Sequence, residues 1–276
     1  MPVRHPAPWI RVCTAPGLAL VVLSLAAVGC RPKVQGYVKD PWEHPIEGAT
    51  VIMEGVAERE VTDEDGFFKM PSLDAEMNLL AGKDGYIKAL TVAAPYGEDE
   101  DEDDREPIQL TLYPDPAEPG FYAVGSAEYV RLETEEARAI GTELDTFNGV
   151  PDIGEALVPS DKPMRVVFST GLRPHEISRL DLRLHKLNFI DHTVIKGALG
   201  DTEATVNLFV ADSPVAFDLK GFPTRNDYLI SSRDALAPGY YAFHIEGVLT
   251  SHDRAMMDHL PRELRVAYPF EVQAPE

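Results

Sequence analysis

The sequence predicts an all-β protein in which two β-sandwiches follow an N-terminal export segment. Short runs of alternating apolar and polar residues recur along the chain, which is typical of strands with one buried face. Clusters of Gly, Pro and Asp separate these runs, as turns do. With 276 residues, 44% of them hydrophobic, the chain is long enough for one or two domains with ordinary cores.

Residues 1–29 have the features of an export signal. The segment carries Arg4 and Arg11 and no acid, and residues 18–28 read LALVVLSLAAV, in which Ser24 is the only polar side chain. A helix needs about 20 apolar residues to span a bilayer, so this run is too short to do so. A basic start and a short apolar run that ends in small residues predict a removable signal.

The end of this segment, Ala27-Val28-Gly29-Cys30, resembles the bacterial lipobox, although lipoboxes prefer Leu where this chain has Ala27. The resemblance implies that Cys30 receives diacylglycerol and becomes the N-terminus. It also implies outer-membrane sorting, because Arg31 stands where an Asp would retain a lipoprotein at the inner membrane. The alternative is an ordinary secretory signal with an incidental Cys30, which would leave an odd free thiol in an exported protein.

Cysteine usage and charge limit the partners that we expect. The two cysteines are Cys13, inside the signal, and Cys30, so we expect no disulfide. Residues 30–276 retain 23 of the 25 basic residues and all 46 acids, a net charge of −23. This surface repels phosphate backbones, so we expect no nucleic-acid partner. We expect the lipid, and not a basic patch, to hold the protein to a membrane.

Residues 30–113 are predicted to form the first domain, a seven-stranded sandwich. The expected strands are Val34–Lys39, Thr50–Met53, Arg59–Thr62, Phe67–Met70, Asn78–Lys83, Lys88–Val92 and Ile108–Tyr113.

Three motifs in this domain are specific: a G-x-V-x-D start with P-I-x-G-A-x-V, then T-D-x-x-G-x-F, then K-x-G-Y. Together they resemble the carboxypeptidase regulatory-like domain, a transthyretin-like sandwich that is grouped with carbohydrate-binding-like folds. We expect Gly48 to permit a turn before Ala49 and Val51 enter the core. We expect Asp63 and Gly66 to form a tight turn before the buried Phe68.

Two segments are predicted to lie outside the sandwiches. Glu98–Asp104 is a run of seven acids, which cannot pack and predicts an exposed loop that could collect Ca²⁺ only loosely. Residues 114–120 hold three prolines and a glycine and predict a short, stiff linker.

Residues 121–276 are predicted to form a larger immunoglobulin-like or jelly-roll sandwich, and they resemble no family that we recognise. Thr134 could cap a helix over residues 135–140, and Ser251 could cap one over residues 252–260. The expected strands are Phe121–Val124, Glu128–Leu132, Met164–Ser169, Leu180–Leu187, Thr205–Val210, Val215–Leu219, Asp227–Ser231, Tyr240–Glu246 and Arg265–Val272.

No motif for catalysis, cofactor binding or metal binding occurs in the chain. His-Glu-x-x-His and Gly-x-Ser-x-Gly are both absent, so we expect no enzyme activity, no cofactor and no metal site. Trp42, in the loop between the first two strands, could stack on a sugar ring and contact a glycan. The alternative is that Trp42 packs on its own domain.

The sequence therefore predicts a membrane-tethered, non-enzymatic envelope lipoprotein that serves as an interaction or structural module. Its partner would be an envelope protein or a glycan. One alternative is a carbohydrate-binding protein that acts through the regulatory-like domain. The other is a hydrolase with an unrecognised site in residues 121–276.

Overall fold

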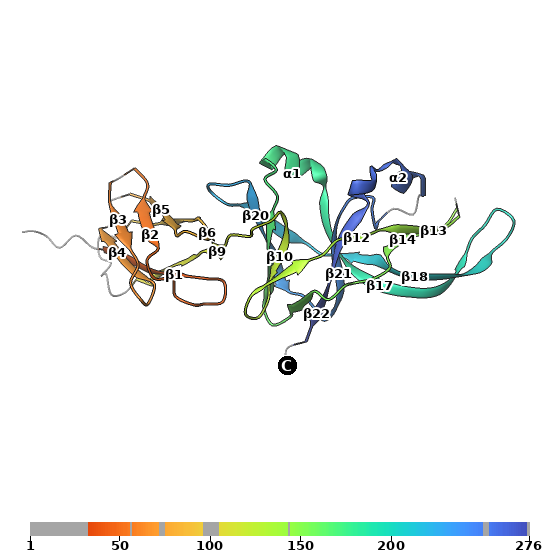
Figure 1. The fold of residues 1–276 in the computed structure, drawn as a ribbon, viewed down its shortest axis with the longest axis horizontal. Coiled ribbons are helices and arrows are strands. Elements are labelled where there is room, and N and C mark those ends of the chain that lie inside the picture. The colour runs from red at the N-terminus through yellow and green to blue at the C-terminus, as the bar shows by residue number, and fades with distance from the viewer. Residues whose placement is uncertain are drawn as a thin grey trace, which may run out of the picture. The chain divides into compact units, whose positions relative to one another are not determined.

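The computed structural model describes residues 33–55, 57–71, 75–95, 105–142, 144–250 and 254–274. These residues are almost all β, arranged in several sheets that pack as sandwiches, which confirms the predicted fold class (Figure 1). No helix in the described ranges is long and apolar enough to cross a membrane. The predicted lipid site, Cys30, and the acidic run Glu98–Asp104 lie outside these ranges.

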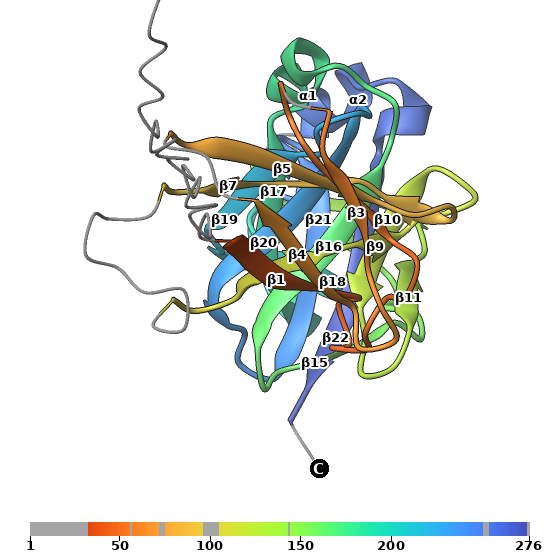
Figure 2. The ribbon, with the colours of Figure 1, turned by 90° about the vertical axis from the view of Figure 1, so that its left-hand side faces the viewer.

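The first sandwich contains the strands β1 (Lys33–Lys39), β2 (Thr50–Met53), β3 (Arg59–Val61), β4 (Phe67–Pro71), β5 (Met77–Gly82), β6 (Tyr86–Ile87), β7 (Ala89–Ala93), β8 (Ile108–Thr111) and β9 (Tyr113–Pro114). One sheet has the order β4-β1-β8, the facing sheet has the order β3-β2-β5-β7, and β6 pairs with β9. Figure 2 shows β1 and β4 side by side, as their antiparallel pairing requires. Each of the seven predicted ranges overlaps a strand, and the short β6 and β9, which pair with each other, make the sandwich nine-stranded where seven strands were predicted.

The turn before β4 forms as the sequence predicts. The Asp63 carboxylate accepts hydrogen bonds from the backbone N–H groups of Asp65 and Phe67, at 3.0 and 2.9 Å. Gly66 has a φ of 72°, and a Cβ there would collide with the Val38 carbonyl oxygen. This turn directs Phe68 into the core, where it is 1% exposed.

The second sandwich pairs a five-strand sheet with a larger curled sheet. The five-strand sheet contains β10 (Gly120–Val124), β11 (Tyr129–Leu132), β16 (Pro163–Ser169), β19 (Phe217–Gly221) and β20 (Asp227–Ala235), in the order β11-β10-β16-β20-β19. The curled sheet contains β12 (Glu135–Glu136), β13 (Arg138–Gly141), β14 (Thr146–Val150), β15 (Leu157–Pro159), β17 (Leu182–Ile195), β18 (Thr202–Pro214), β21 (Gly239–Ile245) and β22 (Val266–Gln273).

The curled sheet closes on itself. Its order is β12-β22-β21-β17-β18-β14-β13, with β15 beside β22. β12 and β13 stand at opposite ends of this order, yet only Ala137 separates them in the chain. The two ends of the sheet therefore meet. β17 pairs with β21 only over Leu182–Leu187, and its remainder extends with β18 as a long hairpin (Figure 1).

Each face of the curled sheet has its own core. Phe243 and Phe270 face the five-strand sheet and pack there with Phe121 and Ile230. The opposite face packs a smaller cluster of aliphatic side chains inside the curl: Ala137, Val150, Ile153, Leu187, Ala242, Val248, Leu249, Met257 and Ala267. Alternate residues of β21 and β22 thus serve two cores, which explains why these strands contain so few polar side chains.

The helices differ from the prediction in two places. Residues 135–140, predicted as a helix, form β12 and β13, because backbone pairing of Glu135 with Ala267 outweighs local helix preference. α1 (Pro174–Leu180) was not predicted; Leu180, expected to begin a strand, ends this helix instead. α2 (Arg254–His259) confirms a helix within the range 252–260, and its predicted cap Ser251 lies outside the described residues.

Candidate functional site

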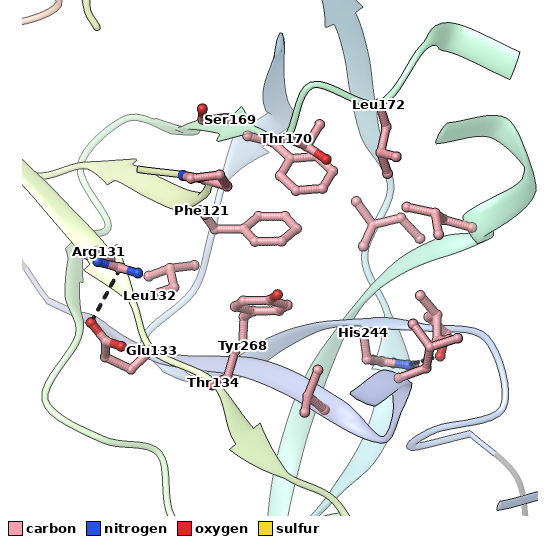
Figure 3. Close-up of a pocket in the computed structure, with 18 of the residues that line it drawn as sticks. Phe121, Arg131, Leu132, Glu133, Thr134, Ser169, Thr170, Leu172, His244 and Tyr268 are labelled. Carbon is pink, nitrogen blue, oxygen red and sulfur yellow. Dashed lines mark hydrogen bonds and ion pairs between the residues drawn. The ribbon is translucent and has the colours of Figure 1, made fainter. Parts of the chain in front are cut away.

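A pocket of about 350 Å³ opens between the five-strand sheet and the curled sheet, and we call it the slot (Figure 3). This is about twelve times the roughly 30 Å³ that one water occupies in the liquid. Its lining is mainly aromatic rings and leucines; the charged side chains Arg131, Glu133 and Glu263 are exposed, whereas Ser169 and His244 are buried. The size and lining are those of a site for a small organic molecule.

One wall of the slot is a column of three aromatic rings. Phe168 of β16 stacks on Phe121 of β10, with centroids 4.1 Å apart. Phe121 in turn contacts Tyr268 of β22, with centroids 4.4 Å apart. The column bridges the two sheets because each strand turns alternate residues inward. Of the three rings, only Tyr268 is half-buried, whereas Phe121 and Phe168 are buried behind it; Figure 3 shows the neighbouring rings of Phe121 and Tyr268.

The opposite wall consists of leucines from the loop after β16, from the end of α1 and from the start of β17. They are Leu172, Leu180 and Leu182. Two hydrogen bonds hold this loop: the Thr170 N–H donates to the Asp227 carboxylate at 3.1 Å, and the Tyr228 hydroxyl donates to the Leu172 carbonyl at 2.7 Å. Asp227 and Tyr228 thus hold this wall of the slot in place through hydrogen bonds to the backbone of the loop.

The rim supplies charge and hydrogen-bonding capacity. Arg131 lies at the mouth and pairs with Glu118 at 2.7 Å and with Glu133 at 3.6 Å. The Tyr268 hydroxyl has no hydrogen-bond partner among the described residues, and burial raises the pKa of this phenol. An uncharged hydroxyl is therefore available to one polar atom of a ligand.

A buried histidine pair lies beside the slot. His244 Nδ1 lies 2.8 Å from the Ile245 carbonyl oxygen, so it carries the proton and donates. His244 Nε2 must then accept the hydrogen bond from His185 Nδ1, 2.9 Å away. Burial lowers the pKa of His244 to about 4 and lowers the pKa of His185 as well. Both imidazoles are neutral at pH 7.

Ser169 and His244 both line the slot, which raises the question of whether His244 could act as a base for Ser169 as a nucleophile. Both ring nitrogens of His244 are already committed, one to a carbonyl and one to His185. His244 therefore offers no free nitrogen to activate Ser169. Within the described ranges, no group of three or more His, Cys, Asp or Glu is placed to hold a metal ion.

Trp42, the predicted glycan contact, lies at the junction of the two sandwiches. Its indole N–H donates to the Gly125 carbonyl at 3.0 Å, and its ring meets the edge of Tyr129 at 5.5 Å. Trp42 is half-buried against the second sandwich, whereas both interpretations of the sequence kept it within the first domain. The glycan role stays a prediction, but the Trp42 ring packs against Tyr129 of the second sandwich.

The sequence indicated parts of the slot without revealing it. Val266, Tyr268, Phe270 and Val272 form an apolar stripe at period two, and the structure turns Phe270 and Val272 into the core. The stripe does not show that Tyr268 meets Phe121, more than a hundred residues earlier. The histidine pair has no sequence signal either, because His185 and His244 meet only through strand pairing.

No family model matches the chain, and no curated protein matches it either.

Proposed function

We propose that the chain is a lipid-anchored binding protein of the bacterial envelope, whose second sandwich holds a small, largely apolar ligand in the slot. The anchor rests on the signal-like residues 1–29 and on Cys30. The binding role rests on one observation. A column of aromatic rings faces a wall of leucines across about 350 Å³, with one unbonded hydroxyl on Tyr268.

The chemistry of the slot defines the ligand class. Ring and leucine surfaces gain free energy when an apolar group displaces water from them. The half-buried Tyr268 and Leu172 present apolar surface to a ligand, whereas the buried Phe121 and Phe168 support the wall behind them. The Tyr268 hydroxyl would fix the ligand's orientation through one hydrogen bond. We therefore expect a compact apolar molecule with a single polar end.

Binding is favoured over hydrolysis by the state of the histidines. A hydrolase needs a base within reach of its nucleophile, and His244 is bonded away from Ser169. The alternative of a glycan site in the first domain alone receives no added support, because Trp42 packs against Gly125 and Tyr129 of the second sandwich.

A fluorescent apolar probe tests the slot. We expect N-phenyl-1-naphthylamine to bind saturably and to brighten as it leaves water. Thr134 is an exposed residue at the mouth, so Thr134→Trp should block entry without disturbing the core. Thr202→Trp, at an exposed site on β18, is the matched control and should keep binding. Equal brightening in both variants would remove the slot from the proposal.

Lipid labelling in a bacterial host tests the anchor separately. Cys30→Ser should abolish incorporation of a labelled fatty acid, because the thiol that carries the lipid is gone. Cys13→Ser is the matched control, since that cysteine lies within the predicted signal, and it should leave labelling intact. Labelling that survives in the Cys30 variant would refute the anchor and leave the slot untouched.

A further inference from the structure

A second pocket, separate from the slot, lies at the junction of the two sandwiches and carries positive charge. Its volume is about 170 Å³, roughly six times the 30 Å³ that one liquid water occupies. Trp42 of the first sandwich and Arg165 and Lys162 of the second all line it. We call this the junction pocket.

Arg165 is held rigidly at the base of the junction. Its Nη2 donates to the Pro41 carbonyl at 2.9 Å, and its Nη1 lies 3.5 Å from the Tyr113 hydroxyl. Both partners are neutral oxygens of the first sandwich. Among the described residues, no carboxylate lies within ion-pair distance of Arg165. Its positive charge is therefore not cancelled by a partner, and several of its five N–H donors stay available.

The charge of this pocket contrasts with the rest of the chain. The whole sequence has a net charge of −21, yet Arg165 and Lys162 meet only one acid, Asp161, in the pocket lining. Lys162 is exposed and makes no ion pair within the described ranges. A local cationic site on an acidic protein concentrates anions where the surrounding surface repels them.

The walls set the size and shape of the anion. Pro159 and Pro163 are stiff, and the half-buried Trp42 adds an aromatic surface. A volume of about 170 Å³ is on the scale of one sugar-sized ring. A planar guanidinium such as Arg165 matches the geometry of a carboxylate or a phosphate.

We propose that the junction pocket binds a single sugar ring that carries an oxyanion, with Arg165 and Lys162 on the anion and Trp42 beside the ring. The two sources of this chemistry are the carboxylate of a sugar acid and the phosphate of a sugar phosphate. The site is independent of the slot, and both sandwiches must be in place to form it. Binding would therefore tighten the junction between them.

The fluorescence of Trp42 can report binding in the junction pocket. In the full chain with Trp9→Phe, Trp42 is the only indole, so its fluorescence reports on this pocket alone. We expect a saturable fluorescence change and a raised melting temperature with glucuronate, with glucose 6-phosphate, or with both. Glucose at the same concentrations should have no effect. The stronger of the two anions identifies the source of the charge.

Lys162→Met gives the residue-level test, because an exposed lysine can be replaced without loss of packing. We expect binding of the preferred anion to weaken by about fivefold. Lys220→Met, at an exposed lysine of β19, is the matched control and should bind as the parent does. A flat response to both anions, an equal response to glucose, or unchanged affinity in the Lys162 variant would overturn the proposal.

Discussion

The two sandwiches bury polar side chains in different ways. In the first, the buried polar residues Asp40 and Thr62 both serve turns; Asp40, for example, accepts the N–H groups of Trp42 and His44 at 2.8 and 2.9 Å. In the second, buried Thr146, Asp227 and Ser232 also bond to backbone groups, but His185 and His244 additionally share a hydrogen bond between two buried side chains. Asn148 there is 2% exposed, and neither polar atom of its amide has a hydrogen-bond partner among the described residues.

This difference indicates where function is located. Buried polar groups that complete turns contribute to folding and nothing more. Buried titratable or unpaired groups cost stability, so a fold retains them where they have a second use. The second sandwich also contains the slot, whose lining is mainly apolar, whereas the pocket of the first sandwich that lies between Gly48 and Lys88 has a more polar lining. We therefore expect core mutations to separate the two: loss of stability with unchanged binding to the slot in the first, and loss of stability with altered binding to the slot in the second.

The largest expected effect contrasts a buried phenylalanine in each sandwich. Phe121→Ala and Phe68→Ala should each reduce the free energy of unfolding by about 3–5 kcal/mol, because both rings are 1% exposed. Phe121 stacks on Phe168 and lines the slot, so its loss should also alter binding of the naphthylamine probe. Urea denaturation and probe titration measure the two effects.

Phe68 is the control for that second effect, since its ring packs only in the first core. Its replacement should destabilise the protein without changing probe affinity in the folded fraction. If both variants change probe binding equally, the proposed division between the two sandwiches is wrong.

The same division determines how much the sequence could predict. In the first sandwich, β2 has the predicted bounds Thr50–Met53, because local turns such as that at Asp63 fix each strand. In the second, the helix predicted over residues 135–140 was wrong. Glu135 and Glu136 pair with β22, which lies about 130 positions away in the chain, and local sequence patterns do not show this pairing. The slot could not be predicted either, because its rings converge from three strands that are distant in sequence. Local rules contain no information on such convergence.

The histidine pair predicts a pH dependence that originates in the second sandwich. The pKa of His244 is about 4 in the folded protein, below the ordinary value of 6.5 for an unfolded chain. The unfolded state therefore binds more protons as the pH falls, and stability is lost between about pH 6.5 and pH 4. The expected loss is about 3 kcal/mol. Urea denaturation across this range measures it.

His244→Gln removes the titrating ring, so its stability should fall less steeply over the same pH range. His175→Gln, at an exposed histidine for which the described residues show no ion pair, is the control variant against which the slope is compared. Parallel curves for parent and His244 variant would show that other groups cause the acid sensitivity.

Trp42 tests whether the two sandwiches unfold together. Trp42→Ala removes the hydrogen bond to Gly125 and the ring contact with Tyr129, for an expected loss of about 2 kcal/mol. Because these contacts cross the junction, the single calorimetric transition that we expect for the parent should split into two. Trp42→Phe keeps the ring contact and should split the transition less. An unsplit transition in the alanine variant would mean that the remaining junction contacts suffice.

We expect the smallest loss of stability from replacing Thr62, a buried polar residue of the first sandwich. The Thr62 hydroxyl donates to the Ile46 carbonyl and accepts the Ala49 N–H at 2.9 Å, all in a buried turn. Thr62→Val preserves shape but leaves both backbone groups unpaired, at a cost of about 1–2 kcal/mol. Thr91→Val, on the edge strand β7, should change stability much less. Since Thr62 serves only the turn, probe binding and acid sensitivity should remain those of the parent; a change in either would show that the first sandwich also acts on the second.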